Sequence, residues 1–208
     1  FYVELKVITF DGCLDSITKP VEIFPVPVAD FFVASVCEED IAVFVDSSKV
    51  TPPAIISTWS WTFGDGDSSV SQNPGHFYSY GYYVVNLEVI SGNGCVDTVQ
   101  KGIVIFPEPA AGFSFVSECE GDPLTFTDIS SVPTGSLSTW QWNFGDGSPV
   151  DPSSNPSHTF LIDDTYTVTL IVESDRGCND TLSQSVLVYA NPTTFFSNNT
   201  VCEGTQTD

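Results

Sequence analysis

The sequence predicts an all-β protein built from tandem immunoglobulin-like β-sandwiches, and three observations support this class. Apolar and polar residues alternate with a period of two in several segments, which is typical of half-buried strands. Turn residues recur about every 8 to 12 positions, as in a sandwich of short strands. The chain also matches itself at a shift of 82 or 83 residues, which is the size of an independent small domain rather than of a short solenoid repeat.

The strands and turns can be placed in order within each repeat. The clearest strands are residues 83–90 and 166–172, where Tyr, Val and Leu occupy alternate positions. Asp65-Gly66 and Asp146-Gly147 suit tight hairpin turns, and Gly92-Asn93-Gly94 suits the next hairpin. We found no segment with helical periodicity.

Aromatic residues precede the first of these turns in both repeats. Three of them share one parity on a strand and are expected to pack in the core, although an exposed carbohydrate-binding platform is the alternative. They are Trp59, Trp61 and Phe63 in one repeat and Trp140, Trp142 and Phe144 in the next.

Proline-rich segments mark the seams between domains and are predicted to be short, stiff linkers. They lie at residues 24–28, 106–110 and 189–193. The predicted parts are the C-terminal strands of a truncated domain at 1–26, complete domains at 27–107 and 108–190, and the first strand of a further domain at 191–208. We interpret the chain as part of a longer protein because it begins in mid-pattern at Phe1 and contains no Met.

The charge balance excludes several classes of partner. The 208 residues include 27 acidic and 5 basic side chains, for a formal net charge of -22. Nucleic acids and anionic membranes need a cationic patch that this chain cannot form. A content of 41% apolar and 13% aromatic residues nevertheless indicates folded domains with real cores.

Three motifs of the repeat resemble the PKD domain family. Trp-x-Phe-Gly-Asp-Gly occurs at 61–66 and 142–147, followed by Asn-Pro-x-His at 73–76 and 155–158 and then by Tyr-x-Val-x-Leu-x-Val. Gly-Cys-x-Asp-Thr looks like the form common in giant secreted surface proteins of Bacteroidota, of the adhesin or gliding-motility type. The resemblance implies a seven-strand sandwich that acts as a spacer or adhesive module, and it implies no particular ligand.

The histidines do not indicate an active site. His76 and His158 are the only two, and they occupy equivalent places in different domains, so they cannot converge on one metal or one proton transfer. We expect each to be a loop side chain that hydrogen-bonds the backbone. Asp65 and Asp146 are expected to serve hairpin geometry. Asp67 next to Asp65 suggests calcium as an alternative, but the full loop pattern of alternating carboxylates and a later Glu is missing. Since the sequence also lacks the common nucleophile and zinc motifs, we predict no enzyme activity and no cofactor.

Two weaker site predictions concern calcium and glycosylation. Glu38, Glu39 and Asp40 form an acidic cluster that could bind calcium at a domain junction, and a solvated acidic turn is the alternative. An Asp-Ser/Thr-aliphatic sequence recurs in each repeat and resembles the acceptor of O-glycosylation in Bacteroidota, whereas Thr is also simply a good strand former. The acceptor hydroxyls would be those of Ser16, Thr98 and Thr181.

Six cysteines in an acidic repeat chain indicate disulfides formed outside the cytoplasm. Cysteines 24 residues apart along extended chain lie too far apart to pair, because a disulfide needs Cα atoms within about 7 Å. Pairing within domains, Cys37 to Cys95 and Cys119 to Cys178, remains an alternative, as do free or otherwise paired thiols. We favour Cys37 to Cys178 across the junction, because in this sandwich the early cysteine is expected at the C-terminal pole and the late one at the N-terminal pole. Partners outside the chain are then predicted for Cys13, Cys95, Cys119 and Cys202.

These expectations combine into a mechanical function. We expect a structural or adhesive segment of a long extracellular filament or adhesin stalk on a bacterial surface, with neighbouring repeats as its main partners and surface glycans or proteins as further ones. An accessory spacer region of a secreted hydrolase is the alternative. Acidic surfaces would keep neighbouring filaments from aggregating.

Overall fold

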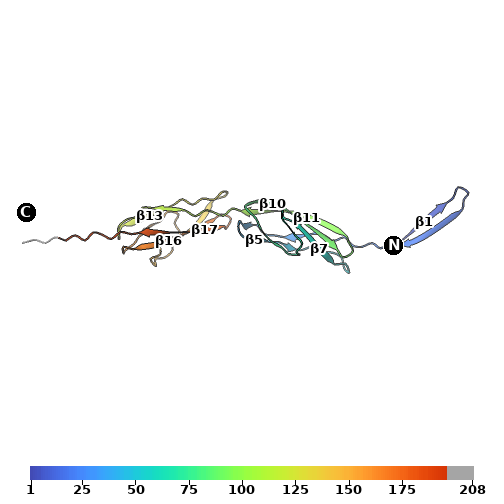
Figure 1. Cartoon of the computed structure of the whole chain (residues 1–208), viewed down its shortest axis with the longest axis horizontal. Helices are drawn as coiled ribbons and strands as arrows, with labels where there is room; N and C mark the ends of the chain where they lie inside the picture. The colour runs from blue at the N-terminus through green and yellow to red at the C-terminus, as the bar shows by residue number, and fades with distance from the viewer. Residues whose placement is uncertain (196–208) are drawn as a thin grey trace, which may run out of the picture. The chain divides into compact units, whose positions relative to one another are not determined.

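A computed structural model describes residues 1–195, and each regular element in this part is a β-strand (Figure 1). This confirms the predicted all-β class. The chain divides into two compact units, Phe1–Pro107 and Glu108–Asp208. None of the described elements is a helix long and apolar enough to cross a membrane.

The first unit contains a hairpin and one complete sandwich domain. Its strands are β1 (Tyr2–Ile8), β2 (Leu14–Pro20), β3 (Phe31–Phe32), β4 (Val36–Cys37), β5 (Ile41–Val43), β6 (Val45–Asp46), β7 (Ile56–Thr62), β8 (Ser68–Ser69), β9 (Gly75–Phe77), β10 (Gly81–Ser91) and β11 (Val96–Phe106). One layer of the sandwich is the sheet β4-β11-β10-β7-β8, and the pairs β3-β6 and β5-β9 form the strands opposite it.

The second unit repeats this arrangement. Its strands are β12 (Phe113–Phe115), β13 (Pro123–Asp128), β14 (Leu137–Asn143), β15 (Ser157–Thr159), β16 (Thr165–Ser174) and β17 (Asn179–Leu187). They form the sheets β12-β13-β15 and β14-β16-β17. The strands predicted at 83–90 and 166–172 lie inside β10 and β16.

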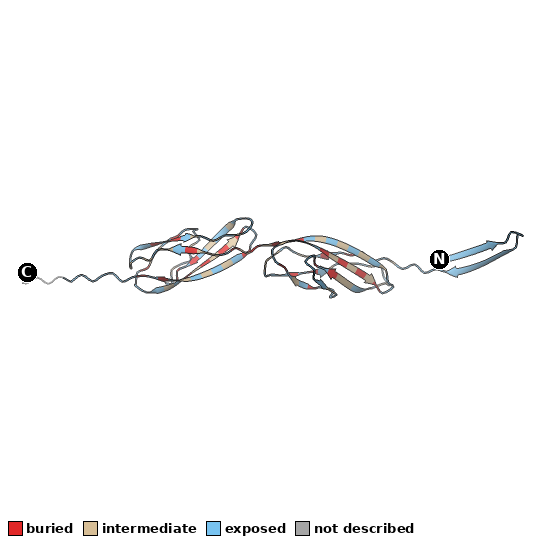
Figure 2. Cartoon of the chain, turned by 45° about the horizontal axis from the view of Figure 1, so that its top comes forward, coloured by how far each residue is buried: buried red, intermediate tan, exposed pale blue. Residues whose placement is uncertain are grey.

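Alternation along these long strands builds both cores (Figure 2). In β10 the side chains of Val85, Leu87 and Val89 are fully buried, while the residues between them are partly exposed. Trp61 and Trp142 are also fully buried, and each donates its indole N–H to a backbone carbonyl, that of Ser71 or Ser153, at 2.9 Å. The expectation that these aromatic residues pack in the core is therefore confirmed.

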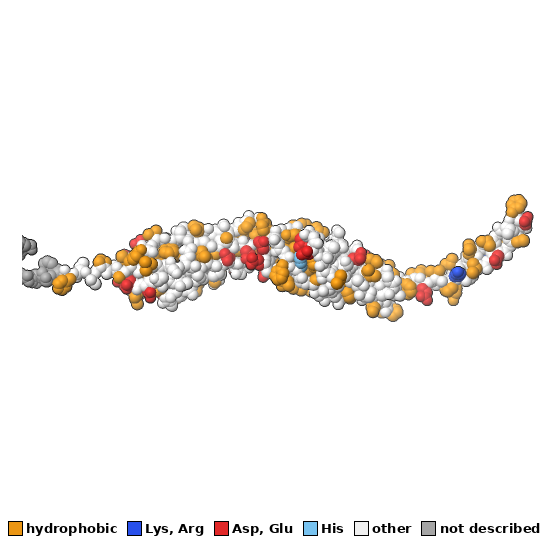
Figure 3. All heavy atoms as spheres, in the orientation of Figure 1, with side chains coloured by type: hydrophobic (Ala, Val, Ile, Leu, Met, Phe, Trp, Pro, Cys, Tyr) orange, Lys and Arg blue, Asp and Glu red, His pale blue; other side chains and the backbone are white. Residues whose placement is uncertain are grey.

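The hairpin β1-β2 differs from the two sandwiches because all of its residues are exposed. Its strands pair antiparallel from Tyr2 opposite Pro20 to Ile8 opposite Leu14. Apolar side chains along it, such as Leu5 and Ile17, are accessible (orange in Figure 3). An isolated two-stranded hairpin is marginally stable in water. Its assignment to a domain that begins upstream stays a prediction.

Candidate functional site

The turn after β7 positions a carboxylate through its backbone. The N–H of Phe63 donates to the carbonyl of Asp67 at 3.1 Å, and the N–H of Asp67 donates to Oδ1 of Asp65 at 3.0 Å. Gly64 and Gly66 have φ values of 86° and 110°, which glycine adopts at little cost. The predicted hairpin is present, since β7 pairs directly with β8.

The other oxygen of Asp65 contacts a histidine of the neighbouring strand β9. Nε2 of His76 lies 2.6 Å from Oδ2 of Asp65. The imidazole stacks on Phe63 with ring centroids 4.2 Å apart and meets Tyr78 edge-on at 4.5 Å. With 14% of its side chain exposed, His76 is held in one orientation by aromatic rings on two sides.

The second domain contains the same pair in the same setting. Nε2 of His158 lies 2.7 Å from Oδ2 of Asp146, and its ring stacks on Phe144 at 3.9 Å. The position of Asp67 is taken by Ser148, whose N–H and hydroxyl both donate to Oδ1 of Asp146, at 3.0 and 2.6 Å. Two side chains therefore distinguish the clusters: Ser148 replaces Asp67, and Phe160 replaces Tyr78 as the ring that meets the imidazole edge-on.

This geometry corrects the expectation for the histidines. His76 and His158 lie on the short strands β9 and β15 and bond a carboxylate, whereas a loop position and a backbone partner were predicted. The reason is that the turns after β7 and β14 bring their aspartates to β9 and β15. Residues 11 positions apart meet in the first domain and residues 12 apart in the second. Asp65 and Asp146 thus do more than shape a hairpin.

The hydrogen bonds lower the pKa of both aspartates. Burial raises the pKa of Asp65, but bonds from His76 and from the backbone of Asp67 outweigh this effect and hold the pKa below its usual value. At Asp146 burial is again outweighed, by the two bonds from Ser148 and the bond from His158, and the pKa falls to about 2. Both groups are carboxylates at neutral pH.

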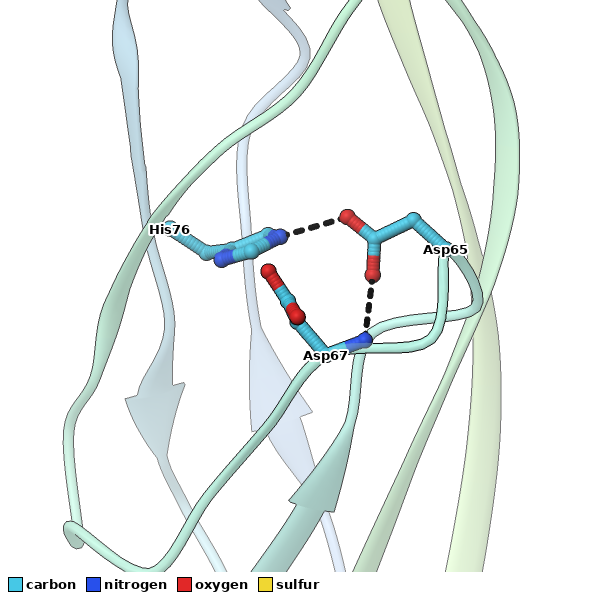
Figure 4. Close-up of side chains that lie close together, drawn as sticks. All are labelled: Asp65, Asp67 and His76. Atoms are coloured by element: carbon cyan, nitrogen blue, oxygen red, sulfur yellow. Dashed lines mark hydrogen bonds and ion pairs between the residues drawn. The ribbon is translucent and has the colours of Figure 1, made fainter.

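Asp65, Asp67 and His76 are grouped closely enough to hold a metal ion (Figure 4). Each offers one ligand atom, and these atoms lie within 4.8 Å of one another. Among the described residues no other group of three or more His, Cys, Asp or Glu meets this criterion. Calcium binding by Glu38, Glu39 and Asp40 stays a prediction.

The disulfide-bonded cysteine of the first domain lies where the chain leaves that domain. Cys37 forms a disulfide and sits on β4, which pairs in parallel with the end of β11, Cys37 opposite Phe106. Cys95 directly precedes Val96, the first residue of β11, and has a free thiol. Since β11 has 11 residues, Cys37 and Cys95 are roughly 35 Å apart at about 3.3 Å per residue. A disulfide within the first domain is therefore sterically excluded.

The disulfide-bonded cysteine of the second domain lies where the chain enters that domain. Cys178 also forms a disulfide, and it closes the β16-β17 hairpin through the bond from the N–H of Ser174 to its carbonyl. Two residues later, Asp180 accepts the N–H of Ala111 at 2.8 Å, which places the domain's first residues beside this hairpin. Cys119 forms a parallel bridge with Tyr189 at the far end of β17 and has a free thiol, as does Cys13. Cys202 lies outside the described residues.

The predicted glycosylation residues are accessible, but their neighbours have another role. Ser16, Thr98 and Thr181 are all exposed on strands. The preceding Asp97 accepts the N–H of Ala29 at 2.8 Å, as Asp180 does for Ala111. Asp97 and Asp180 therefore fasten the start of each complete domain, and glycosylation of Ser16, Thr98 and Thr181 stays a prediction.

A contact between a tryptophan and an aspartate, present in both domains, was not predicted from the sequence. The indole N–H of Trp59 donates to Oδ2 of Asp46 at 2.7 Å, and that of Trp140 donates to Asp128 at 2.8 Å. Both tryptophans are partly buried. Only comparison of the two repeats, which both have an Asp 12 or 13 residues before this Trp, could have suggested the contact.

The fold and the repeated turn define tandem immunoglobulin-like β-sandwich domains, a class that is typically non-catalytic. The model of the PKD domain matches residues 25–105 and 107–188. These matches span most of the sequence, and the chain belongs to the PKD domain family.

Solved structures give similar matches. The PKD1 domain of Vibrio anguillarum Epp is 26% identical, with a TM-score of 0.38 over 40% of this chain and 96% of that one. The PKD1 domain from the Vibrio cholerae metalloprotease PrtV is 30% identical, with a TM-score of 0.36 over 39% and 96%. Fibronectin(III)-like modules of Clostridium thermocellum CbhA are 12% identical, with a TM-score of 0.40 over 84% and 100%.

Proposed function

We propose that this chain is a load-transmitting segment of an extracellular bacterial surface filament or adhesin stalk. In this function each PKD domain is a spacer, and a disulfide between Cys37 and Cys178 bridges the junction of the two domains. Such a bridge would carry tension past the domain cores, so that the segment keeps its length under load. Its partners are neighbouring repeats of the same kind.

The observation that carries the proposal is the placement of the cysteines within each domain. Cys37 lies beside Phe106, at the exit of the first domain, and Cys178 lies beside the entry of the second. Both are disulfide-bonded, whereas Cys13, Cys95 and Cys119 are free. The linker between the domains is short and contains Pro107 and Pro109, which supports a junction that one disulfide could span.

The same placement extends the pattern to further repeats. Cys119 occupies the exit position of the second domain and Cys95 the entry position of the first, equivalent to the two cysteines that form disulfides. Neighbouring repeats of this design would supply their partners. An oxidising location outside the cell follows from such a ladder of disulfides.

Peptide mapping without reduction tests the pairing. Cleavage after Glu22 and Glu38 isolates Cys37, and cleavage after Arg176 and before Asp180 isolates Cys178. We expect one linked peptide pair that contains these two cysteines. The pair should disappear in C178S and persist in C95S. A peptide that joins Cys37 to Cys95 would refute the bridged junction and favour independently stapled domains.

A further inference from the structure

We propose that Asp65, Asp67 and His76 of the first domain form a binding site for a divalent transition-metal ion of the zinc class. The second domain has the same frame without the third ligand and is not expected to bind. The site is distinct from the cysteines and independent of the proposed mechanical function.

The three ligand atoms are close to the spacing that one ion requires. They lie within 4.8 Å of one another, and ligand atoms at about 2.1 Å from zinc are at most about 4 Å apart. Nε2 of His76 and Oδ2 of Asp65 lie 2.6 Å apart as a hydrogen-bonded pair and would separate to about 3 Å to bind one ion. Asp67, whose carboxylate has no hydrogen bond or ion pair within residues 1–195, can rotate toward them (Figure 4). Water can complete the coordination because both aspartates are at the surface.

The other two ligands are held beside each other before an ion arrives. The ring of His76 is sandwiched by Phe63 and the edge of Tyr78, and Oδ1 of Asp65 is anchored by the backbone N–H of Asp67. Because the fold already orders these two side chains, ion binding loses less conformational entropy. An ion would take the place of the hydrogen between Nε2 of His76 and Oδ2 of Asp65; the neutral imidazole would then carry its one proton on Nδ1 and bind the ion through Nε2.

The donor set indicates which ions fit. One imidazole nitrogen and two carboxylate oxygens suit zinc and its neighbours in the first transition row. Calcium takes six to eight oxygen ligands, so an imidazole-containing set of three is a poor calcium site. Two carboxylates neutralise the charge of a divalent ion when the imidazole is neutral.

The second domain provides the matched control within the same chain. Asp146 and His158 reproduce the first pair to within 0.1 Å, and His158 is stacked in the same way. Ser148 replaces the second carboxylate, and its hydroxyl is already committed to Asp146 at 2.6 Å. This cluster offers one negative charge where the first domain offers two.

The experiment is a zinc titration of the whole chain. Binding is measured by calorimetry and by the shifts of the imidazole proton signals in NMR. Thiols are alkylated beforehand because free cysteines bind zinc. The chain has two histidines, so each domain contributes one imidazole. We expect one zinc ion per chain, a shift of the His76 signal alone, and no competition from a tenfold excess of calcium.

Two substitutions make the test reciprocal. D67S should weaken zinc binding by at least about tenfold, because the loss of a group that supports a metal site typically lowers metal affinity by this much or more. S148D should add a second zinc site, so that the NMR signal of His158 also shifts. Unchanged dispersion of the other NMR signals verifies that both variants are folded. Binding that persists in D67S, equal shifts of both histidines, or no heat and no shift with zinc would each overturn the proposal.

Discussion

At the scale of residues, each domain contains one partly exposed pair formed by an aspartate and a histidine. The aspartate closes its own turn through one oxygen and holds a stacked imidazole through the other. This joins the turn after β14 to strand β15 with a charged hydrogen bond, which is stronger than a neutral one. Sequence reasoning identified both residue types but not their contact, because each was explained by its own local turn preference.

The pair should make the stability of the second domain depend on acid. The pKa of Asp146 is lowered to about 2 from 3.8, so its contribution is complete above pH 4 and is lost as the pH falls toward 2. We expect the difference in free energy of unfolding between the wild type and D146N to shrink across this interval. This difference is measured by denaturant unfolding, with hydrogen exchange in peptides from β16 as the readout.

The control for this prediction is D163N, which removes an exposed carboxylate from the same domain. The difference in free energy of unfolding between the wild type and D163N should change less over the same pH interval. A D146N difference that stays constant from pH 4 to pH 2 would show that the pair contributes nothing to acid sensitivity.

At the scale of elements, the turns and long strands could be predicted because their signals are local. Alternation fixes which face of β10 and β16 is buried, and Gly-Asp-Gly fixes the turn. The parallel addition of β4 to β11 could not be predicted, since it joins residues about 70 positions apart through two residue pairs. A two-residue strand has no periodicity to detect.

The two glycines of the turn after β14 should respond differently to substitution. Gly145 and Gly147 both have positive φ, which costs an L-residue about 1–2 kcal/mol. A Cβ at Gly145 would also lie 2.5 Å from the carbonyl oxygen of Thr167, whereas a Cβ at Gly147 would meet nothing within 4 Å.

We therefore expect G147A to destabilise the second domain by about 1 kcal/mol and G145A by about 3 kcal/mol or more, because backbone must move. Denaturant unfolding of the two variants provides the comparison. Equal losses would mean that the close approach of the turn to β16 is not maintained in solution.

At the scale of the whole molecule, the repeat places the cysteines at equivalent positions of successive domains. An 82- to 83-residue period places one cysteine at the exit and one at the entry of each domain. The expected topology of the sandwich was sufficient to predict these ends, because strand order decides them. It could not decide which cysteines pair, since pairing depends on how successive domains meet.

Single-molecule pulling on the two ends of the chain tests the bridged junction most directly. A Cys37 to Cys178 bridge would carry the force and shield nearly all of both domains from extension. Without it, each domain of roughly 80 residues would release about 25 nm as it unfolds, at about 3.6 Å per residue less its folded length. We predict no such steps for the oxidised chain and two for C37S/C178S. Two steps in the oxidised wild type would contradict a force-bearing disulfide between the domains.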